Sequence, residues 1–218
     1  MDRMNIKAVI FDLGNVLLDF NHMLAAGRIS RFSAFTPEEI FELFFDSPIT
    51  GLFEEGKISP QEFFLRVKEK LNLKLGFKEF LPIWNEIFFF SQKNRQVYHL
   101  AKSLKPHLKT ALVSNINILH YEYVLKEFPV FDAFDKVILS CEEGVRKPHP
   151  LIYENTLKAL AVPPAEVFYT DDRLELIEGA RILGIRAFQF INAEQLNKDL
   201  LSCGITRASN APILSSEE

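Results

Sequence analysis

The feature that most constrains the fold is the position at which short apolar runs stop. Residues 7–11 form one apolar run, which ends abruptly at Asp12. A second run, residues 110–113, leads directly into Ser114, and a third run ends shortly before Asp171. A short apolar run closed by polar residues is typical of a strand that is buried on both faces. The pattern therefore predicts buried strands that each present a polar side chain at their carboxyl end.

Helical patterns separate these runs along the chain. Strands that alternate with helices of about ten residues indicate a parallel sheet covered on both faces. The sequence therefore predicts an α/β fold with a doubly wound, Rossmann-like parallel sheet. The predicted helices are residues 97–104, 119–128, 151–160 and 174–183, and two further predicted strands are residues 136–139 and 186–190.

A long segment between the first and second strands has a different character. Of the 21 phenylalanines, 13 lie between residues 32 and 90. Thr36 and Ser59 are each followed by proline and then by acidic residues, which is a typical helix start. We expect about four helices here, packed on phenylalanine side chains. The predicted domains are a core of residues 1–20 and 91–218 and a helical insertion of residues 21–90.

Composition and charge narrow the class of protein. Apolar residues make up 48% of the chain, which is enough for a buried core, and no apolar run is long enough to span a membrane. The net charge of −4 gives no reason to expect a nucleic-acid partner. Residues 1–7 lack the layout of a secretion signal, and Cys141 and Cys203 are expected to be free thiols. We expect a cytoplasmic monomer or homodimer.

Residues able to carry chemistry gather at the predicted strand ends. In open α/β sheets, ligands bind beyond the carboxyl ends of the strands. Taken singly, each of these residues also fits a turn or a helix cap, but their shared position favours one common site. Three carboxylates brought together would repel one another, and Mg²⁺ is a cation that prefers such oxygen ligands. The residues are Asp12, Ser114, Asn115, Asp171 and Asp172, together with Lys147 in the loop after the strand at 136–139.

Four motifs in this order resemble those of the haloacid-dehalogenase superfamily of hydrolases. The helical insertion stands where that superfamily carries its helical cap of the C1 type, and the resemblance spans about residues 7–190. The first motif reads Asp-Leu-Gly-Asn from Asp12, as in some sugar-phosphate phosphatases of the superfamily. The motifs are residues 9–17, residues 112–115, residues 146–148, and residues 168–172 with 178–180.

The resemblance implies a Mg²⁺-dependent phosphomonoester hydrolase that acts on a small phosphorylated metabolite, such as a sugar phosphate, through an aspartyl-phosphate. By resemblance, Asp12 is the nucleophile, and Lys147 offsets negative charge and holds Asp12 ionised. The implied ligands of Mg²⁺ are Asp12, the Gly14 carbonyl and Asp172, with Asp171 as a ligand or water anchor. The implied phosphate-binding residues are Ser114, Asn115 and Lys147.

The first motif departs from the usual phosphatase pattern at Gly14. Most phosphatases of the superfamily have a second aspartate there, which protonates the leaving oxygen. Such general acid–base catalysis is typically worth about 10²–10⁴-fold in rate. Asp19 and His22 are candidates to replace it. We therefore expect substrates whose leaving group needs little protonation, namely anomeric sugar phosphates, aryl phosphates or acyl phosphates.

Two other functions remain open at this point. A 2-haloacid dehalogenase also lacks the second aspartate, but Asp171 and Asp172 would repel an anionic haloacid. A binding module for a phosphorylated ligand would explain Gly14 as a sign of lost catalysis. A phosphomutase is disfavoured, because it needs the missing acid. Residues of the insertion that are candidates to face the substrate are Arg28, Arg31, Phe45, Phe53, Glu54 and Trp84.

Overall fold

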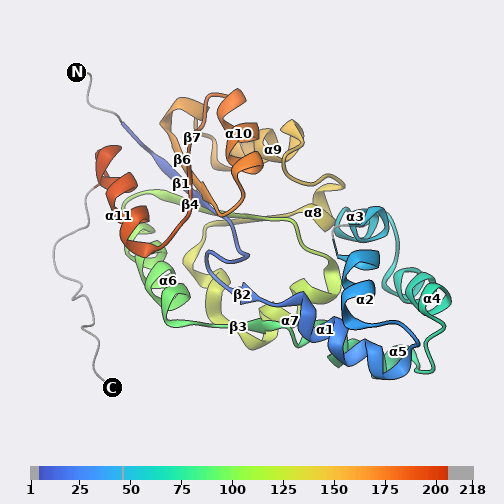
Figure 1. Cartoon of the computed structure of the whole chain (residues 1–218). Coiled ribbons are helices and arrows are strands. Elements are labelled where there is room, and N and C mark those ends of the chain that lie inside the picture. The colour runs from blue at the N-terminus through green and yellow to red at the C-terminus, as the bar shows by residue number, and fades with distance from the viewer. Residues whose placement is uncertain (1–4, 46, 206–218) are drawn as a thin grey trace.

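The computed structural model describes residues 5–45 and 47–205. A parallel five-stranded sheet in the order β5-β4-β1-β6-β7 forms its centre (Figure 1). Phe11 pairs with both Leu112 and Thr170, so β1, β4 and β6 end within two residues of the same level. This register gathers the polar residues that follow these strands at one edge of the sheet. The strands are β1 (Ala8–Phe11), β4 (Lys109–Ser114), β5 (Lys136–Leu139), β6 (Val167–Asp171) and β7 (Arg186–Gln189).

Helices cover both faces of this sheet, as predicted. Val9 and Phe11 point into a cluster with α6 and α11, whereas Ala8 and Ile10 point to the opposite face, against α9 and α10. Figure 1 shows the two pairs of helices on opposite sides of the sheet, which confirms the doubly wound α/β fold. The helices are α6 (Gln92–Leu104), α7 (Ile118–Glu127), α8 (Ser140–Glu143), α9 (Pro150–Leu160), α10 (Leu174–Ile182) and α11 (Ala193–Ser202).

Some predicted boundaries were wrong. Helix α6 begins at Gln92 instead of residue 97, because the Ser91 side chain accepts a hydrogen bond from the Asn94 N–H and starts the helix. Helix α11 was not predicted at all. Its buried apolar positions, Leu196 and Leu200, are too few to predict a helix from their spacing. They pack on one face of the sheet, which only the structure shows.

The described residues of the helical insertion form five α-helices where about four were expected. Their apolar faces meet in one cluster that surrounds Trp84. Capping starts two of them as predicted, with Thr36 before α2 and Ser59 before α4. The predicted domain boundaries themselves stay a prediction. The helices are α1 (His22–Ile29), α2 (Pro37–Phe44), α3 (Pro48–Glu54), α4 (Pro60–Leu71) and α5 (Phe77–Asn85).

A two-stranded antiparallel ribbon joins the insertion to the sheet. It pairs β2 (Asp19–Phe20) with β3 (Phe88–Phe89), so the two ends of the insertion lie side by side. Strands of two residues leave no periodic pattern, and for this reason the ribbon was not predicted. Both of its strands contribute a side chain to the cavity described below.

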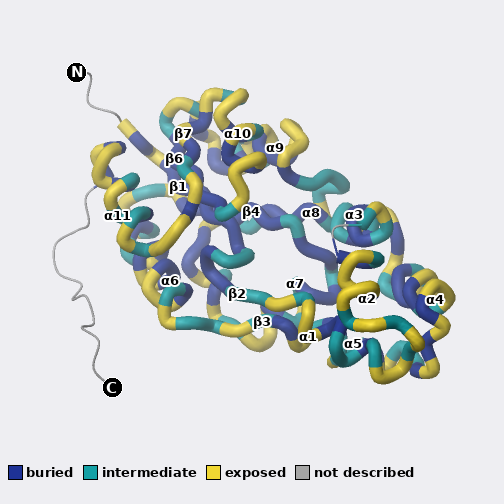
Figure 2. The backbone as a smooth tube through the Cα atoms, viewed as in Figure 1, coloured by how far each residue is buried: buried dark blue, intermediate teal, exposed yellow. Residues whose placement is uncertain are grey.

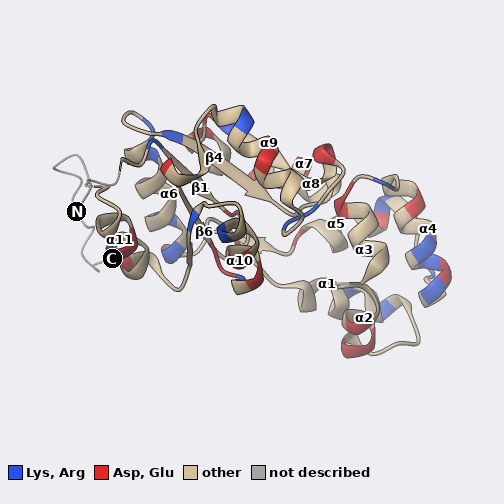
Figure 3. Ribbon diagram, turned by 90° about the horizontal axis from the view of Figure 1, so that it is seen from above, with Lys and Arg blue, Asp and Glu red and all other residues tan. Residues whose placement is uncertain are grey.

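The exterior is that of a folded domain with a mixed surface. Figure 2 shows the central strands as mostly buried and the outer faces of the helices as exposed. Charged residues of both signs lie on outer helices, most visibly on α4 (Figure 3). Among the described residues, no helix is both long and apolar enough to cross a lipid bilayer.

Candidate active site

Lys147 stands at the centre of the polar residues at the sheet edge. Its Nζ lies 2.6 Å from Asp12 Oδ1, 2.6 Å from Asp171 Oδ2 and 3.0 Å from the Val113 carbonyl oxygen. The side chains of Lys147 and Asp171 are almost fully buried, and Asp12 is buried too. A buried ammonium group with this geometry compensates two buried carboxylates at once.

The backbone holds these side chains in place. Asp12 directly follows β1, and its N–H donates to the Thr170 carbonyl on the neighbouring strand at 3.0 Å. The loop that carries Lys147 is fastened to the end of β4 by Asn115. The Asn115 side chain accepts from the Lys147 N–H at 2.8 Å and donates to the Lys147 carbonyl at 2.9 Å. This pair of bonds sets the position of the lysine relative to the carboxyl end of β4.

A third carboxylate completes an acidic cluster. Oxygen atoms of Asp12, Asp171 and Asp172 lie within 4.8 Å of one another. Asp172 Oδ2 accepts a hydrogen bond from Asn15 Nδ2 at 2.9 Å, and Asn15 adopts a left-handed backbone conformation that asparagine tolerates well. Three carboxylates at this spacing fit a divalent cation that prefers oxygen ligands, such as Mg²⁺.

Burial and charge move the pKa values of the cluster in different directions. Burial, together with the charges of Asp171 and Asp172, raises the pKa of Asp12 to about 7, although Lys147 opposes the change. Burial also raises the pKa of Asp172. For Asp171 burial acts in the same sense, but Lys147 and a hydrogen bond from Tyr169 outweigh it, so its pKa is lowered. A bound cation would lower the pKa values of Asp12 and Asp172 and so favour their ionised forms.

A cavity of about 350 Å³ opens in front of the cluster. All seven residues predicted from the sequence line it, which brings the predicted site together in one place. Several other lining residues were not predicted from the sequence: Asn15 and Arg173 adjoin predicted site residues in the chain, whereas Thr50, Phe88 and His120 come from distant elements. The predicted residues that line the cavity are Asp12, Gly14, Ser114, Asn115, Lys147, Asp171 and Asp172.

The space beside Gly14 is filled by an aromatic ring. A β-carbon built on Gly14 would lie 2.8 Å from Cε1 of Phe20, closer than real contacts allow. The side chain of an aspartate at this position would therefore meet the Phe20 ring. The chain lacks the usual aspartate at position 14, and the ring of Phe20 lies where the side chain of that aspartate would begin.

The two candidate replacements for that acid differ in their surroundings. Asp19 Oδ1 forms an ion pair with Lys93 Nζ at 2.7 Å and accepts a hydrogen bond from Asn94. Burial alone would raise the pKa of Asp19, but hydrogen bonds from Lys93, Ser91 and Asn94 lower it, which makes Asp19 a poor proton donor. His22 lines the cavity.

The proposed substrate-facing residues of the insertion also separate into groups. Phe45 and Glu54 line the cavity. Phe53 and Trp84 are buried in the apolar cluster of the insertion instead. Arg28 donates to the Glu86 carbonyl at 2.8 Å, and Arg31 is exposed.

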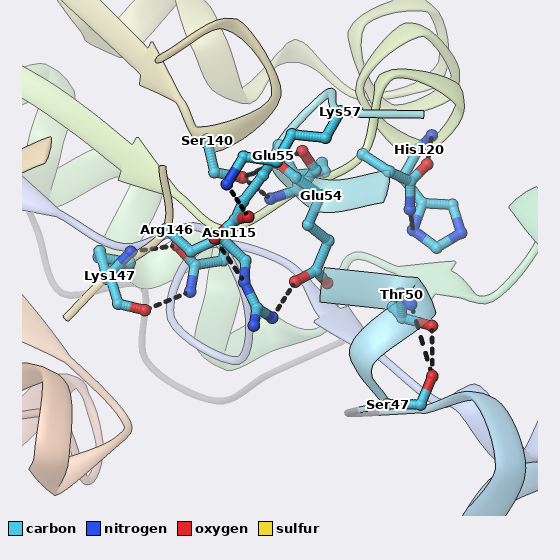
Figure 4. Close-up of polar contacts among 12 residues, drawn as sticks. Ser47, Thr50, Glu54, Glu55, Lys57, Asn115, His120, Ser140, Arg146 and Lys147 are labelled. Carbon is cyan, nitrogen blue, oxygen red and sulfur yellow. Dashed lines mark hydrogen bonds and ion pairs between the residues drawn. The ribbon is translucent and has the colours of Figure 1, made fainter. Parts of the chain in front are cut away.

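Helix α3 is fastened to the sheet domain next to Lys147. Arg146 Nη1 lies 2.9 Å from Glu54 Oε2, and the Ser140 hydroxyl donates to the Glu54 carbonyl at 2.5 Å (Figure 4). Gly51 leaves room for the arginine, since a β-carbon there would lie 2.8 Å from Arg146 Nη2. These contacts hold the insertion over the cavity.

The comparisons with known proteins agree with this fold and site. A family model described as haloacid dehalogenase-like hydrolase matches residues 6–184 of the 218. The chain therefore belongs to the haloacid dehalogenase-like hydrolases, and the resemblance seen in the sequence is confirmed.

Several relatives of known activity are phosphatases. A D-ribitol-5-phosphate phosphatase of Bacteroides thetaiotaomicron is 25% identical over 201 residues, which cover 89% of this chain and 97% of that protein. A glyceraldehyde 3-phosphate phosphatase of Pyrococcus furiosus is 27% identical over 210 residues, which cover 89% of this chain and 85% of that protein.

Solved structures match as well. A haloacid-dehalogenase family enzyme from Bacteroides thetaiotaomicron, in complex with magnesium and inorganic phosphate, superposes with a TM-score of 0.74 at 28% identity, covering 84% of this chain and 93% of that chain. The L-2-haloacid dehalogenase of Xanthobacter autotrophicus shares the fold, with a TM-score of 0.63 at 22% identity, covering 95% of this chain and 85% of that chain.

Proposed function

We propose that this protein is a Mg²⁺-dependent phosphatase that hydrolyses a small phosphate monoester, with Asp12 as the nucleophile. The observation that carries the proposal is the buried cluster in which Lys147 Nζ bridges Asp12 and Asp171 while Asp172 lies beside them. Two relatives that this chain matches over most of their length are phosphatases of small metabolites, which supports the same reaction.

The reaction makes and breaks two bonds in turn. A carboxylate oxygen of Asp12 attacks phosphorus, and the bond from phosphorus to the leaving oxygen breaks, which yields an aspartyl-phosphate. Water then attacks that phosphorus and loses a proton to solvent, the bond from phosphorus to the Asp12 oxygen breaks, and inorganic phosphate leaves while the Asp12 carboxylate is regenerated. Lys147 keeps Asp12 oriented and favours its ionised form, because the ammonium group lies 2.6 Å from Asp12 Oδ1.

Of the remaining groups in the site, we assign some to the phosphate and others to the metal. The Asn115 side chain is engaged with the Lys147 backbone, so its main-chain N–H is the group that we assign to the phosphate, together with the Ser114 hydroxyl. Asp12, the Gly14 carbonyl and Asp172 would hold Mg²⁺. When bound, Mg²⁺ neutralises charge on the phosphate oxygens and on the carboxylates.

Asp171 is better suited to an indirect role at the metal. Its Oδ2 accepts hydrogen bonds from Lys147 and from the Tyr169 hydroxyl, and its Oδ1 accepts from the Arg173 N–H at 3.0 Å. A carboxylate with both oxygens engaged is more easily a water anchor than a direct ligand. This assignment selects one of the two roles that the sequence left open.

The leaving group has to depart with little help from the protein. Gly14 offers no acid, Phe20 lies against Gly14, and Asp19 is held ionised by Lys93. His22 lines the cavity, and we assign its ring to packing against Phe20 and Phe45 and not to proton transfer. On this assignment the leaving oxygen takes its proton from water, so good leaving groups are favoured. A steep fall of kcat with rising leaving-group pKa is expected across a series of monoesters, and a flat dependence would contradict this part of the proposal.

The test is phosphate release from an aryl phosphate with and without Mg²⁺, using Asp12→Asn as the matched control. We expect Mg²⁺-dependent release that the substitution abolishes. Release of halide from a 2-haloacid without Mg²⁺ would instead support a dehalogenase. Tight phosphate binding without turnover of any monoester would support a binding module.

A further inference from the structure

The part of the cavity wall that faces the carboxylates from the side of the insertion is aromatic. His22 stacks on Phe45, with ring centroids 4.3 Å apart and planes inclined by 17°. Phe20 lies 4.8 Å from His22 and 6.1 Å from Phe88, measured between centroids. All four rings line the cavity, and we call them the aromatic wall. Trp84 stacks behind Phe45 at 5.5 Å and supports it from the buried cluster of the insertion.

The polar side chains on the same side of the cavity already have partners in the protein. The Thr50 hydroxyl donates to the Phe44 carbonyl, and the Glu54 carboxylate pairs with Arg146 at 2.9 Å. His120 uses both ring nitrogens, since Nε2–H donates to the Trp84 carbonyl at 3.1 Å and Nδ1 accepts from the Asn117 amide at 3.0 Å. A leaving group rich in hydroxyls would lose hydrogen bonds to water here and regain few, which is costly.

A flat apolar ring has no hydroxyl groups and loses no such hydrogen bonds. His22 and Trp84 cover the two faces of Phe45, so a substrate ring would meet the edge of Phe45, and edge-to-face contacts between rings need no hydrogen bond. A phenol-type leaving group is also far more acidic than an alcohol, as the side chain of tyrosine illustrates. It therefore departs more easily from a site in which Phe20 stands where an acid would be. Phe20 belongs to the aromatic wall and also fills the space at Gly14, and both features favour the same kind of substrate.

We propose that the substrate is an aryl phosphate whose ring lies against the aromatic wall, with Phe20, His22, Phe45 and Phe88 as specificity-determining residues. This inference rests on the proposed phosphatase function and names its substrate class. It separates aryl phosphates from the anomeric sugar phosphates and acyl phosphates that leaving-group chemistry alone would also admit.

The test compares three substrates on the full chain with Mg²⁺. Phenyl phosphate carries a ring, acetyl phosphate has a better leaving group without a ring, and ribitol 5-phosphate is a polyol ester. We expect the KM of phenyl phosphate to be at least tenfold lower than that of acetyl phosphate, and ribitol 5-phosphate to have the lowest kcat/KM. Equal KM values for phenyl and acetyl phosphate, or a preference for the polyol, would overturn the inference.

Substitutions test whether the aromatic wall causes the difference in KM between phenyl phosphate and acetyl phosphate. Phe45→Leu should raise the KM of phenyl phosphate at least fivefold more than that of acetyl phosphate. Phe64→Leu is the matched control, because Phe64 packs on Phe77 and Phe80 within the insertion, and both substrates should be unaffected. A Phe45→Leu effect equal for the two substrates would contradict ring recognition. If no monoester is hydrolysed at all, the phosphatase proposal itself fails, and this inference fails with it.

Discussion

The ring of Phe20 occupies the space that any side chain on Gly14 would need, with 2.8 Å between Phe20 Cε1 and a β-carbon built on the glycine. An aspartate at position 14 therefore requires the Phe20 ring to move or to be removed. We expect Gly14→Asp alone to leave kcat for an alkyl phosphate unchanged or lower. The double variant Gly14→Asp with Phe20→Ala should raise that kcat by tenfold or more, because the new carboxyl group has room to act as an acid.

Steady-state kinetics with an alkyl and an aryl phosphate would measure this, with Phe20→Ala as the control. The gain should be larger for the alkyl ester, whose leaving group needs the proton more. A gain of the same size from Gly14→Asp alone would show that the Phe20 ring does not block the position.

Lys147 compensates two buried carboxylates, so its charge should matter for stability as well as for catalysis. We expect Lys147→Met to abolish activity and to lower the free energy of unfolding by about 3–5 kcal/mol, the usual cost of breaking a buried ion pair. Adding Asp12→Asn should restore part of the stability, since one uncompensated charge is removed. Chemical denaturation measures both effects.

The matched control for this experiment is Lys102→Met. Lys102 pairs with Asp132 at 3.0 Å on the surface, and a far smaller loss of stability is expected there. Similar losses for the two lysines would contradict the role assigned to burial.

The raised pKa of Asp12 predicts that Mg²⁺ and protons compete. The ordinary pKa is 3.8 and burial raises it to about 7 in the folded protein. Without metal, this group favours the folded state at low pH, and that contribution is lost as pH rises from about 4 to about 7. Because Mg²⁺ binds the ionised form, the rise in Tm caused by saturating Mg²⁺ should be larger at about pH 8 than at about pH 5.5. Thermal unfolding with and without Mg²⁺ tests this, and an equal shift at both pH values would count against it.

His120 should make the protein sensitive to acid. Burial, with the nearby charge of His22, lowers the pKa of His120 from 6.5 to about 3. The unfolded chain therefore binds a proton below about pH 6.5 that the folded chain does not. Stability should fall with decreasing pH, by about 2 kcal/mol at about pH 5 from this residue. Urea denaturation at about pH 5 and at neutral pH measures the loss of stability between the two values. This loss should be smaller in His120→Gln, and an unchanged loss would refute the assignment.

The contact between Arg146 and Glu54 should help to keep the insertion closed over the cavity. Arg146→Ala removes the ion pair of 2.9 Å across the two parts of the chain. We expect a severalfold rise in KM for an aryl phosphate and faster proteolysis of the insertion. Lys57→Ala is the control, because Lys57 pairs with Glu55 at 2.8 Å within the insertion (Figure 4). The same kinetics for both variants would mean that the Arg146 contact does not control closure.

Much of the candidate site was predictable because one local rule applied to several strands. Asp12, Ser114 and Asp171 each come at or directly after the end of a buried apolar run. Parallel strands bring their carboxyl ends to one edge, so position along the chain is enough to predict proximity in space. Lys147 was predictable from its motif, although its contacts with both carboxylates belong to the tertiary structure.

The sequence by itself determined the sheet, the acidic cluster and the absence of an aspartate at position 14, since these follow from periodicity and residue identity. Only the tertiary structure decided what stands in place of that aspartate. The short β2–β3 ribbon holds Phe20 against Gly14, and its pairing joins residues far apart in the chain. It also decided that Phe45 faces the cavity while Trp84 is buried behind it. Both are aromatic residues of the same insertion, and their difference arises from long-range packing, which carries no local sequence signal.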